Sequence, residues 1–398
     1  MFGKVGKDTV ITIFSRSAIV LINLVIVMCI TRFWGAEGKG YQALFIANLG
    51  LISIVTNIFT NSSISYFVRK VGASKLYAQA CIWTFISSIL GIIVCYYLDR
   101  SSYLYLLLIT CILTGYMTFH NALYIGMQKI RYYNLLAILQ PLFLLILILL
   151  LQTFKTTSYF DYFYAYIISL VLVIAIAHFL TKKVVGKIKL QLDFSVTKQS
   201  FNYGFQNELS NFLQFLASRM GYYFIVYYLS EASLGIFSVG VAISESVWIF
   251  SRSISMVQYS KIIKEGNTQN ARKGVVVASL FSISFSLLSV VILLLLPKTF
   301  FGYLFGNEFI EIKQIILLMS PGILCTAFST VYGHYFAAIG KLKIQVLKSL
   351  IGVVLTLLLS ILLIPIWKMD GACVANSIMR FGSAIVVIVY FIVLKGKD

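Results

Sequence analysis

The chain has 398 residues, of which 60% are hydrophobic and only 11% are charged, and its mean hydropathy is +0.93. A soluble protein of this length needs far more polar surface, so the composition indicates a membrane protein. The formal net charge of +19 is spread over many short segments without an RNA- or DNA-binding motif, which argues against nucleic acid as a partner. The six cysteines lie in or beside apolar segments without metal-ligand spacing, so we expect neither disulfides nor a metal site.

Twelve apolar stretches follow one another along the chain. Most of them reach the roughly 20 residues that a helix needs to cross a bilayer. They cover residues 9–31, 41–65, 76–98, 103–127, 134–152, 162–181, 205–228, 234–257, 274–296, 312–338, 344–366 and 371–394. The sequence therefore predicts an all-α polytopic membrane protein with twelve transmembrane helices.

Basic residues alternate between the segments that connect these stretches. The odd-numbered segments, both termini included, hold 20 Lys and Arg, whereas the even-numbered segments hold six. Cytoplasmic loops of membrane proteins carry such an excess, and only an even number of spans keeps the alternation in phase to the end. The pattern predicts that both termini lie in the cytoplasm.

The longest interruption of the apolar pattern follows the sixth stretch and is rich in lysine. It divides the chain into an N-terminal six-helix lobe at 1–185, a basic cytoplasmic linker at 186–204 and a C-terminal six-helix lobe at 205–398.

A short motif recurs in the two halves. The turn after the first stretch contains Glu37, then Gly40 and Tyr41, and the turn after the seventh contains Glu231, then Gly235, then an aromatic residue. Two six-helix halves that begin on the same side of the membrane predict lobes related by a pseudo-two-fold axis along the membrane normal.

Charged residues also occur inside the predicted spans, where each costs at least about 2.5–3.5 kcal/mol and normally faces a bundle interior or a water-filled cavity. The deep set comprises four arginines and two glutamates: Arg16, Arg219, Arg252, Arg380, Glu208 and Glu245. Helical spacing also gives several spans a polar face, which adds further candidates for substrate binding: Asn57 and Asn61 in the second stretch, Asn211 in the seventh and Trp248 in the eighth. Lys313 and Lys348 lie near helix ends, where they can extend to the membrane surface without a function.

The net positive sign of this set predicts a cationic cavity for an anionic substrate, in which aromatic rings such as Trp248 could stack on sugars. Glu208 and Glu245 are candidates for binding a coupling ion, since a buried carboxylate is a tunable site. The alternative is that Arg–Glu pairs only hold helices together, and for Glu245 and Arg252 the two interpretations stay open. We see no catalytic set.

Arg16, the turn "GAEGKGYQAL", the closing "SYFVRK" and the turn "SEASLGIFSV" together resemble the Wzx-type polysaccharide and O-antigen flippases. These belong to the multidrug/oligosaccharidyl-lipid/polysaccharide exporter superfamily. The chain departs from the family pattern at Ala36, where proline is common, and at Ser230, where glycine is common.

The resemblance implies a flippase that moves an undecaprenyl-pyrophosphate-linked oligosaccharide across the bacterial inner membrane by alternating access. The substrate would be a repeat unit of O-antigen, as in lipopolysaccharide, or of another surface polysaccharide. Coupling to H⁺ or Na⁺, and no other cofactor, is expected. The expected partners are the lipid-linked oligosaccharide, membrane lipids and other polysaccharide assembly proteins.

Two alternatives remain. A multidrug exporter of the same superfamily would have the same layout, although cationic drugs favour an acidic interior. A membrane polysaccharide polymerase or ligase would need a large outer loop for its acceptor, and the predicted outer loops are short. We therefore do not expect an enzyme.

Overall fold

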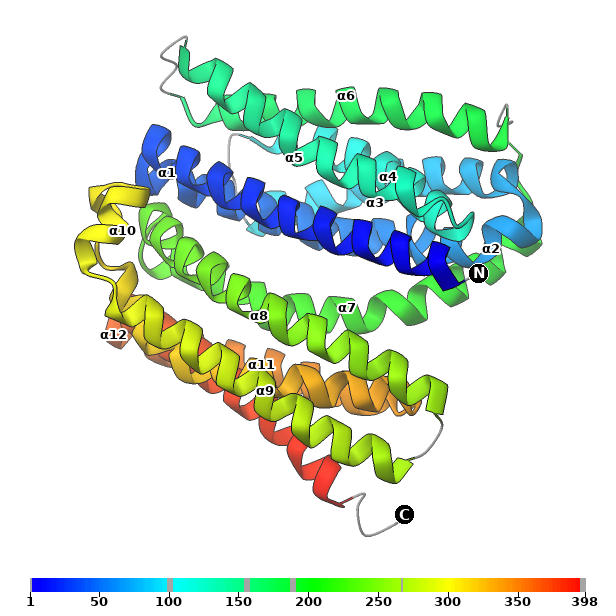
Figure 1. Ribbon diagram of the computed structural model, residues 1–398. Helices are drawn as coiled ribbons and strands as arrows, with labels where there is room; N and C mark the ends of the chain where they lie inside the picture. The colour runs from blue at the N-terminus through cyan, green and yellow to red at the C-terminus, as the bar shows by residue number, and fades with distance from the viewer. Residues whose placement is uncertain (1, 99–102, 154–157, 187–190, 266–267, 394–398) are drawn as a thin grey trace. The chain divides into compact units, whose positions relative to one another are not determined.

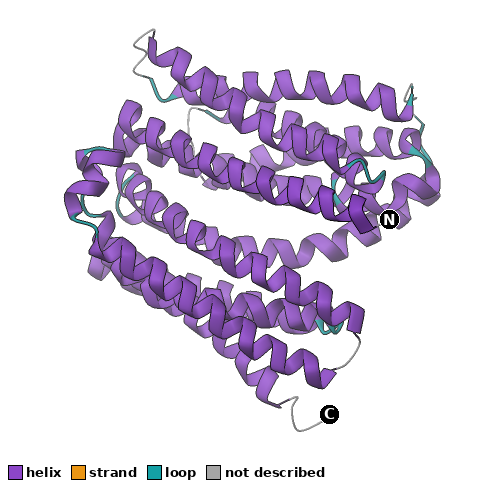
Figure 2. Ribbon diagram, viewed as in Figure 1, coloured by secondary structure: helices purple, strands orange, loops and turns teal. Residues whose placement is uncertain are grey.

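A computed structural model describes residues 2–98, 103–153, 158–186, 191–265 and 268–393, and in this part of the chain the structure is helical with no strand (Figures 1 and 2). The helices are α1 (Phe2–Thr60), α2 (Ser62–Val71), α3 (Ala73–Leu98), α4 (Leu104–Gly126), α5 (Ile130–Thr153), α6 (Phe160–Val185), α7 (Phe194–Tyr228), α8 (Glu231–Glu265), α9 (Thr268–Leu295), α10 (Lys298–Phe305), the 3₁₀ helix η1 (Asn307–Phe309), α11 (Ile312–Ala338) and α12 (Leu342–Val393).

Two of these elements are each two helices joined at a kink. In α1 the backbone leaves helical geometry at Gly35 (φ 64°, ψ −165°), and in α12 it does so at Lys368 (φ 49°, ψ −124°). Glycine adopts a positive φ without steric cost, whereas lysine there is strained. Within the described residues, nine helical segments are long and apolar enough to cross a membrane, the kinked elements being counted once each. The total of twelve spans stays a prediction.

By its internal contacts the chain divides into two compact units. The first unit contains Met1–Trp34 and Phe45–Phe212, and the second contains Gly35–Leu44 and Leu213–Asp398. The short segment Gly35–Leu44 thus packs with the C-terminal half of the chain, although its sequence lies in the N-terminal half.

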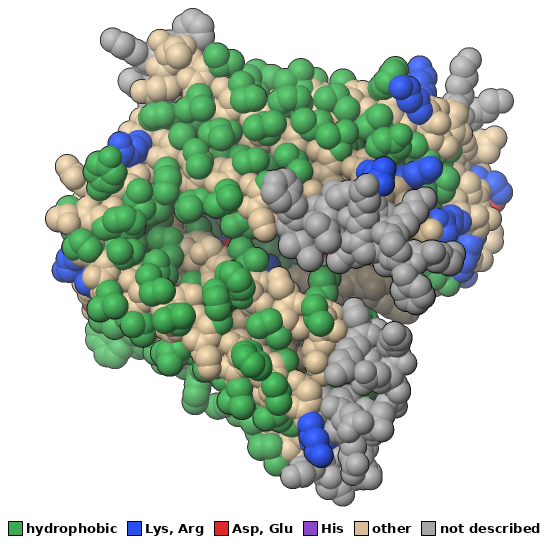
Figure 3. All heavy atoms as spheres, in the orientation of Figure 1, with side chains coloured by type: hydrophobic (Ala, Val, Ile, Leu, Met, Phe, Trp, Pro, Cys, Tyr) green, Lys and Arg blue, Asp and Glu red, His purple; other side chains and the backbone are tan. Residues whose placement is uncertain are grey.

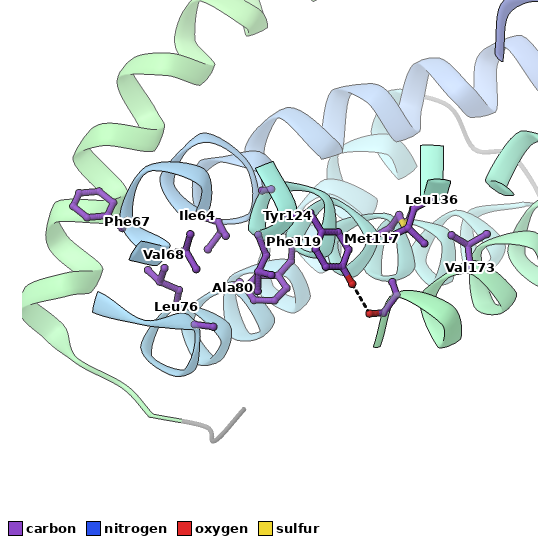
Figure 4. Close-up of a cluster of buried hydrophobic side chains, with 14 of the residues drawn as sticks. Ile64, Phe67, Val68, Leu76, Ala80, Met117, Phe119, Tyr124, Leu136 and Val173 are labelled. Carbon is purple, nitrogen blue, oxygen red and sulfur yellow. Dashed lines mark hydrogen bonds between the residues drawn. The ribbon is translucent and has the colours of Figure 1, made fainter. Parts of the chain in front are cut away.

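The first unit has an apolar core built mainly from α2, α3, α4 and α6, to which α5 contributes Leu136 and α7 contributes Val196. Figure 4 shows part of it, with Phe119 and Tyr124 of α4 close to Ile64 of α2. The hydroxyl of Tyr124 donates a hydrogen bond of 2.7 Å to the carbonyl oxygen of Ala177, so this buried polar group is satisfied.

Many large apolar side chains are instead exposed on the outside of the helices. On α3 they include Phe85 and Leu90, and on α9 they include Phe281 and Leu288. Figure 3 shows such hydrophobic side chains over much of the visible face. A surface of this kind is stable in lipid and unstable in water, as the composition predicts.

The start of α7 differs from the sequence prediction. The helix begins at Phe194, inside the segment 186–204 that we predicted as a linker. Its first turn is capped by Asp193, whose carboxylate accepts hydrogen bonds from the backbone N–H groups of Ser195 and Val196. The same carboxylate pairs with Lys75 at 2.9 Å, and this hydrogen bond, together with the capping ones, holds the pKa of Asp193 below its usual range. The helix therefore begins at its polar cap, before the apolar stretch that the sequence predicted to start at residue 205.

Candidate functional site

The two turns that carry the recurring motif meet inside the second unit. A Cβ atom placed on Gly40 would lie 1.8 Å from the carbonyl oxygen of Glu231, four residues before Gly235. A Cβ atom on Gly235 would lie 1.9 Å from the carbonyl oxygen of Ala36, four residues before Gly40. The two contacts are reciprocal, as expected if the two turns are equivalent parts of a repeat. We call this contact the glycine crossing.

Beside the glycine crossing, a carboxylate caps the second helix of α1. The backbone N–H of Ala36 donates a hydrogen bond of 2.5 Å to Oε2 of Glu308, in η1. The positive φ of Gly35 turns this N–H, the first of the new helix, toward the carboxylate. A negative charge is favourable at a helix N-terminus, so Glu308 stabilises the turn in its place.

An ion pair joins two helices of the second unit. Nη2 of Arg219, on α7, donates to Oε1 of Glu245, on α8, at 2.8 Å, and the other guanidinium nitrogen donates to the hydroxyl of Tyr222. The sequence left open whether Glu245 belongs to an Arg–Glu pair that holds helices together. In this conformation the two residues pair with each other and join α7 to α8.

Arg380 of α12 forms a second polar cluster in the same unit. It is buried, and it donates hydrogen bonds to Asn376 at 2.6 Å and to Thr326 at 3.3 Å, both neutral. Its guanidinium carbon lies 4.1 Å from the ring centre of Trp248, which is a cation–π contact. The indole of Trp248 donates to the carbonyl of Ile323 at 3.2 Å. In this conformation the ring therefore packs on an arginine, and its predicted stacking on sugars stays a prediction.

The two clusters belong to one interior. Arg380 interacts electrostatically with both Arg219 and Glu245. A crevice beside Tyr222 and Asn376 has a volume of about 10 Å³, which is space for about one water molecule. Arg380 is buried, whereas the side chains of Arg219 and Glu245 are 25% and 36% exposed, so the ion pair is the more accessible part of this interior.

Two further lysines belong to this interior, and the sequence interpretation missed both. Lys39 was counted among the loop residues, but its side chain is only 5% exposed because the helix resumes directly after Gly35. Lys348 was expected to extend to the membrane surface, but its ammonium contacts the hydroxyl of Ser329 at 3.5 Å and interacts electrostatically with Arg380. The sequence signal that could have indicated a buried Lys39 was its position between two glycines, Gly38 and Gly40, in a tight turn.

The first unit contains a different polar site. Glu208 of α7 is 3% exposed, and its carboxylate accepts hydrogen bonds from the amide of Asn61 at 3.4 Å and from that of Asn211 at 3.0 Å. Among the residues that the structure describes, no basic side chain pairs with it. Asn57 lies half-buried one turn before Asn61 and accepts a 3.5 Å hydrogen bond from Thr60. The predicted polar residues of the second and seventh stretches thus come together around Glu208.

The remaining two arginines of the deep set are exposed, although Arg252 interacts electrostatically with Arg380. Arg16 is exposed in the first unit and donates to the hydroxyl of Tyr133, on α5, at 2.6 Å. Arg252 is exposed on α8. Their predicted part in a cavity therefore stays a prediction, while Arg219 and Arg380 are brought into one interior.

Solved structures share this arrangement of helices. An inward-facing multidrug resistance MATE family transporter of the MOP superfamily aligns with a TM-score of 0.78 at 14% identity, over 94% of this chain and 94% of its own. The lipid II flippase MurJ, in an inward closed conformation, aligns with a TM-score of 0.76 at 14% identity, over 96% of this chain and 87% of its own. The chain has the fold of these transporters. The prediction of an all-α polytopic membrane protein is confirmed. The MATE transporter is described as a member of the MOP superfamily, which is the superfamily that the turn motifs of this chain resemble.

Sequence similarity is more limited. The capsular polysaccharide biosynthesis protein CapF of Staphylococcus aureus is 29% identical over 152 residues, which are 37% of this chain and 38% of CapF. The match thus spans little more than a third of that relative. No model of a known protein family matches the chain.

Proposed function

We propose that this protein is a flippase for an undecaprenyl-pyrophosphate-linked oligosaccharide, a repeat unit of O-antigen or another surface polysaccharide, in the bacterial inner membrane. In this proposal both termini are cytoplasmic, and the sugar and pyrophosphate cross through a polar interior while the lipid tail stays in the bilayer. The fold supports a transporter of this kind, because a lipid II flippase shares it. The partial similarity to a capsular polysaccharide protein supports a sugar polymer precursor as the cargo.

The observation that carries the proposal is the excess of positive charge inside the second unit. Arg219, Arg380, Lys39 and Lys348 lie in the same interior as one carboxylate, Glu245. Guanidinium groups bind phosphate oxygens through paired, charge-assisted hydrogen bonds, and ammonium groups bind them as point charges. An interior of this sign suits a pyrophosphate.

The proposed transport is coupled to H⁺ or Na⁺ at Glu208, with no other cofactor. A carboxylate that is buried and bonded only to neutral amides can take up a proton or a small cation to neutralise its charge. Glu245 is the less suitable of the two candidates, since Arg219 already compensates it.

The test is deletion of the gene in its native host. The proposal predicts the loss of one surface polysaccharide and the accumulation of its lipid-linked repeat unit on the cytoplasmic side. Unchanged surface polysaccharide, with no accumulated lipid-linked precursor, would contradict it. Complementation with the wild-type gene is the control.

A multidrug exporter is the second candidate, because the MATE transporter aligns at least as well as MurJ does. A cationic drug would meet repulsion from Arg219 and Arg380, so we favour the anionic substrate. The same deletion strain separates the two functions, since loss of an exporter raises drug sensitivity and leaves surface polysaccharide intact. We expect no enzymatic activity from either.

A further inference from the structure

Lys39 is a buried cation without an acidic partner. Its side chain is 5% exposed, and its ammonium donates a hydrogen bond to the amide oxygen of Gln42, one turn further along the helix. Within the described parts of the chain, no carboxylate lies within ion-pair distance of it. Its charged neighbour is Arg219, which repels it. Burial of a cation in such surroundings is costly, so packing alone is a poor reason for a lysine at this position.

The repeat shows what packing alone requires at this position. The glycine crossing makes Gly40 equivalent to Gly235, because each approaches the carbonyl oxygen four residues before the other. The residue before Gly40 is Lys39, and the residue before Gly235 is Leu234, which is fully buried. A leucine therefore fills the equivalent place in the second turn. The charge of Lys39 is an addition that the packing of the crossing does not need.

We propose that Lys39 is an anion-binding residue of the transport path, which takes phosphate oxygens of a prenyl-pyrophosphate-linked substrate together with Arg219. This inference rests on the proposed function. Two cations that repel each other are both stabilised when a phosphate group lies between them. The pattern of basic residues predicts that this turn is at the outer ends of the helices, so the contact belongs to the late part of outward transport. Lys39 is covered in this conformation, and the contact forms in another state of the transport cycle.

The experiment measures binding of farnesyl pyrophosphate to the purified protein in detergent, with farnesol as the uncharged control ligand. Lys39→Met keeps the apolar stem and removes the charge, whereas Lys39→Arg keeps the charge and changes the shape. Lys313→Met removes a lysine elsewhere in the second unit, and Leu234→Met changes the equivalent position without a change of charge.

We expect Lys39→Met to bind farnesyl pyrophosphate at least about ten-fold more weakly than the wild type, which is the loss of one charge-assisted hydrogen bond. Lys39→Arg should retain most of the binding, and the two control variants should bind as the wild type does. A purely packing role predicts the reverse order, with the arginine variant more damaged than the methionine variant.

Wild-type affinity in Lys39→Met, with an unchanged melting profile, would overturn the inference and leave the proposed function standing. If Lys39→Met does not fold, weak binding by a folded Lys39→Arg would likewise overturn it, and retained binding would support it. If the wild type itself fails to prefer farnesyl pyrophosphate over farnesol, the proposed function fails, and this inference fails with it.

Discussion

The glycine crossing gives a quantitative prediction for Gly40→Ala. The new Cβ atom would lie 1.8 Å from the carbonyl oxygen of Glu231, whereas ordinary contact begins at 3.4 Å, so the two backbones must separate by about 1.6 Å. Neither partner is a flexible side chain that can rotate away. The cost should reach the upper end of overpacking, about 3 kcal/mol. Alanine regains about 1 kcal/mol of helix propensity. The net loss of stability is therefore about 2 kcal/mol.

The assay is thermal unfolding of the purified protein in detergent. At about 2–4 °C per kcal/mol, the midpoint of Gly40→Ala should fall by about 4–8 °C. The matched control is Gly221→Ala in α7, where the nearest atom, a hydroxyl oxygen, is 4.0 Å from the new Cβ. That variant should be unchanged or slightly more stable, because it gains helix propensity without a clash.

The reciprocity of the crossing adds a second expectation. Gly235→Ala should cost about as much as Gly40→Ala, because its Cβ meets a carbonyl oxygen at 1.9 Å. The double variant should cost less than the sum of the two, since one separation of the helices relieves both clashes. A melting midpoint of Gly40→Ala equal to that of Gly221→Ala, or strict additivity in the double variant, would refute the reasoning.

Three further predictions concern charged groups. Arg219→Gln and Glu245→Gln should show a coupling energy of about 1–2 kcal/mol in a double-mutant cycle. This value lies between those of exposed and buried ion pairs, because the two side chains are 25% and 36% exposed. A coupling energy of zero would mean that the ion pair does not form. The low pKa of Asp193, caused first by its hydrogen bond to Lys75, stabilises the protein above the ordinary carboxyl pKa of about 4, and this contribution disappears as the pH falls through the lowered value. Melting curves from pH 7 to pH 3 should therefore show a smaller loss for Asp193→Asn than for the wild type, and equal losses would contradict the assignment. Glu208→Gln should fold normally but lose the response of transport to an imposed H⁺ or Na⁺ gradient, measured in proteoliposomes, and a retained response would exclude Glu208 as the coupling site.

Much of the fold could be predicted because its signals are local. The length of the apolar stretches predicts most of the spans. The glutamate, glycine and aromatic residue in each of the two turns indicate a repeat, and in the structure these turns meet at the glycine crossing. The kink at Lys368 lies in the predicted break between the stretches 344–366 and 371–394. The positive φ of this lysine has no local signal, because it is imposed by the surroundings. The start of α7 was only partly predictable. The sequence contains the capping residue Asp193, but the apolar pattern from which the helix was predicted begins later, at residue 205.

The candidate site was harder to predict, because it depends on how each helix is rotated. Arg219 and Glu245 are 26 residues apart on different helices, so no spacing rule joins them. Lys39 looked like a loop residue because a turn between two apolar stretches was expected to be open to water. The structure packs that turn into the second unit, and so its lysine is buried.

The central claim is that a cationic interior moves a lipid-linked anion. Its most direct test is translocation of a fluorescent undecaprenyl-pyrophosphate-linked oligosaccharide by the purified protein in proteoliposomes, with Arg380→Gln as the variant. We expect wild-type protein to move the lipid faster than protein-free vesicles do, and Arg380→Gln to be at least about ten-fold slower, because it removes a charged phosphate contact. Movement no faster than in empty vesicles, or an unchanged rate in Arg380→Gln, would contradict the account.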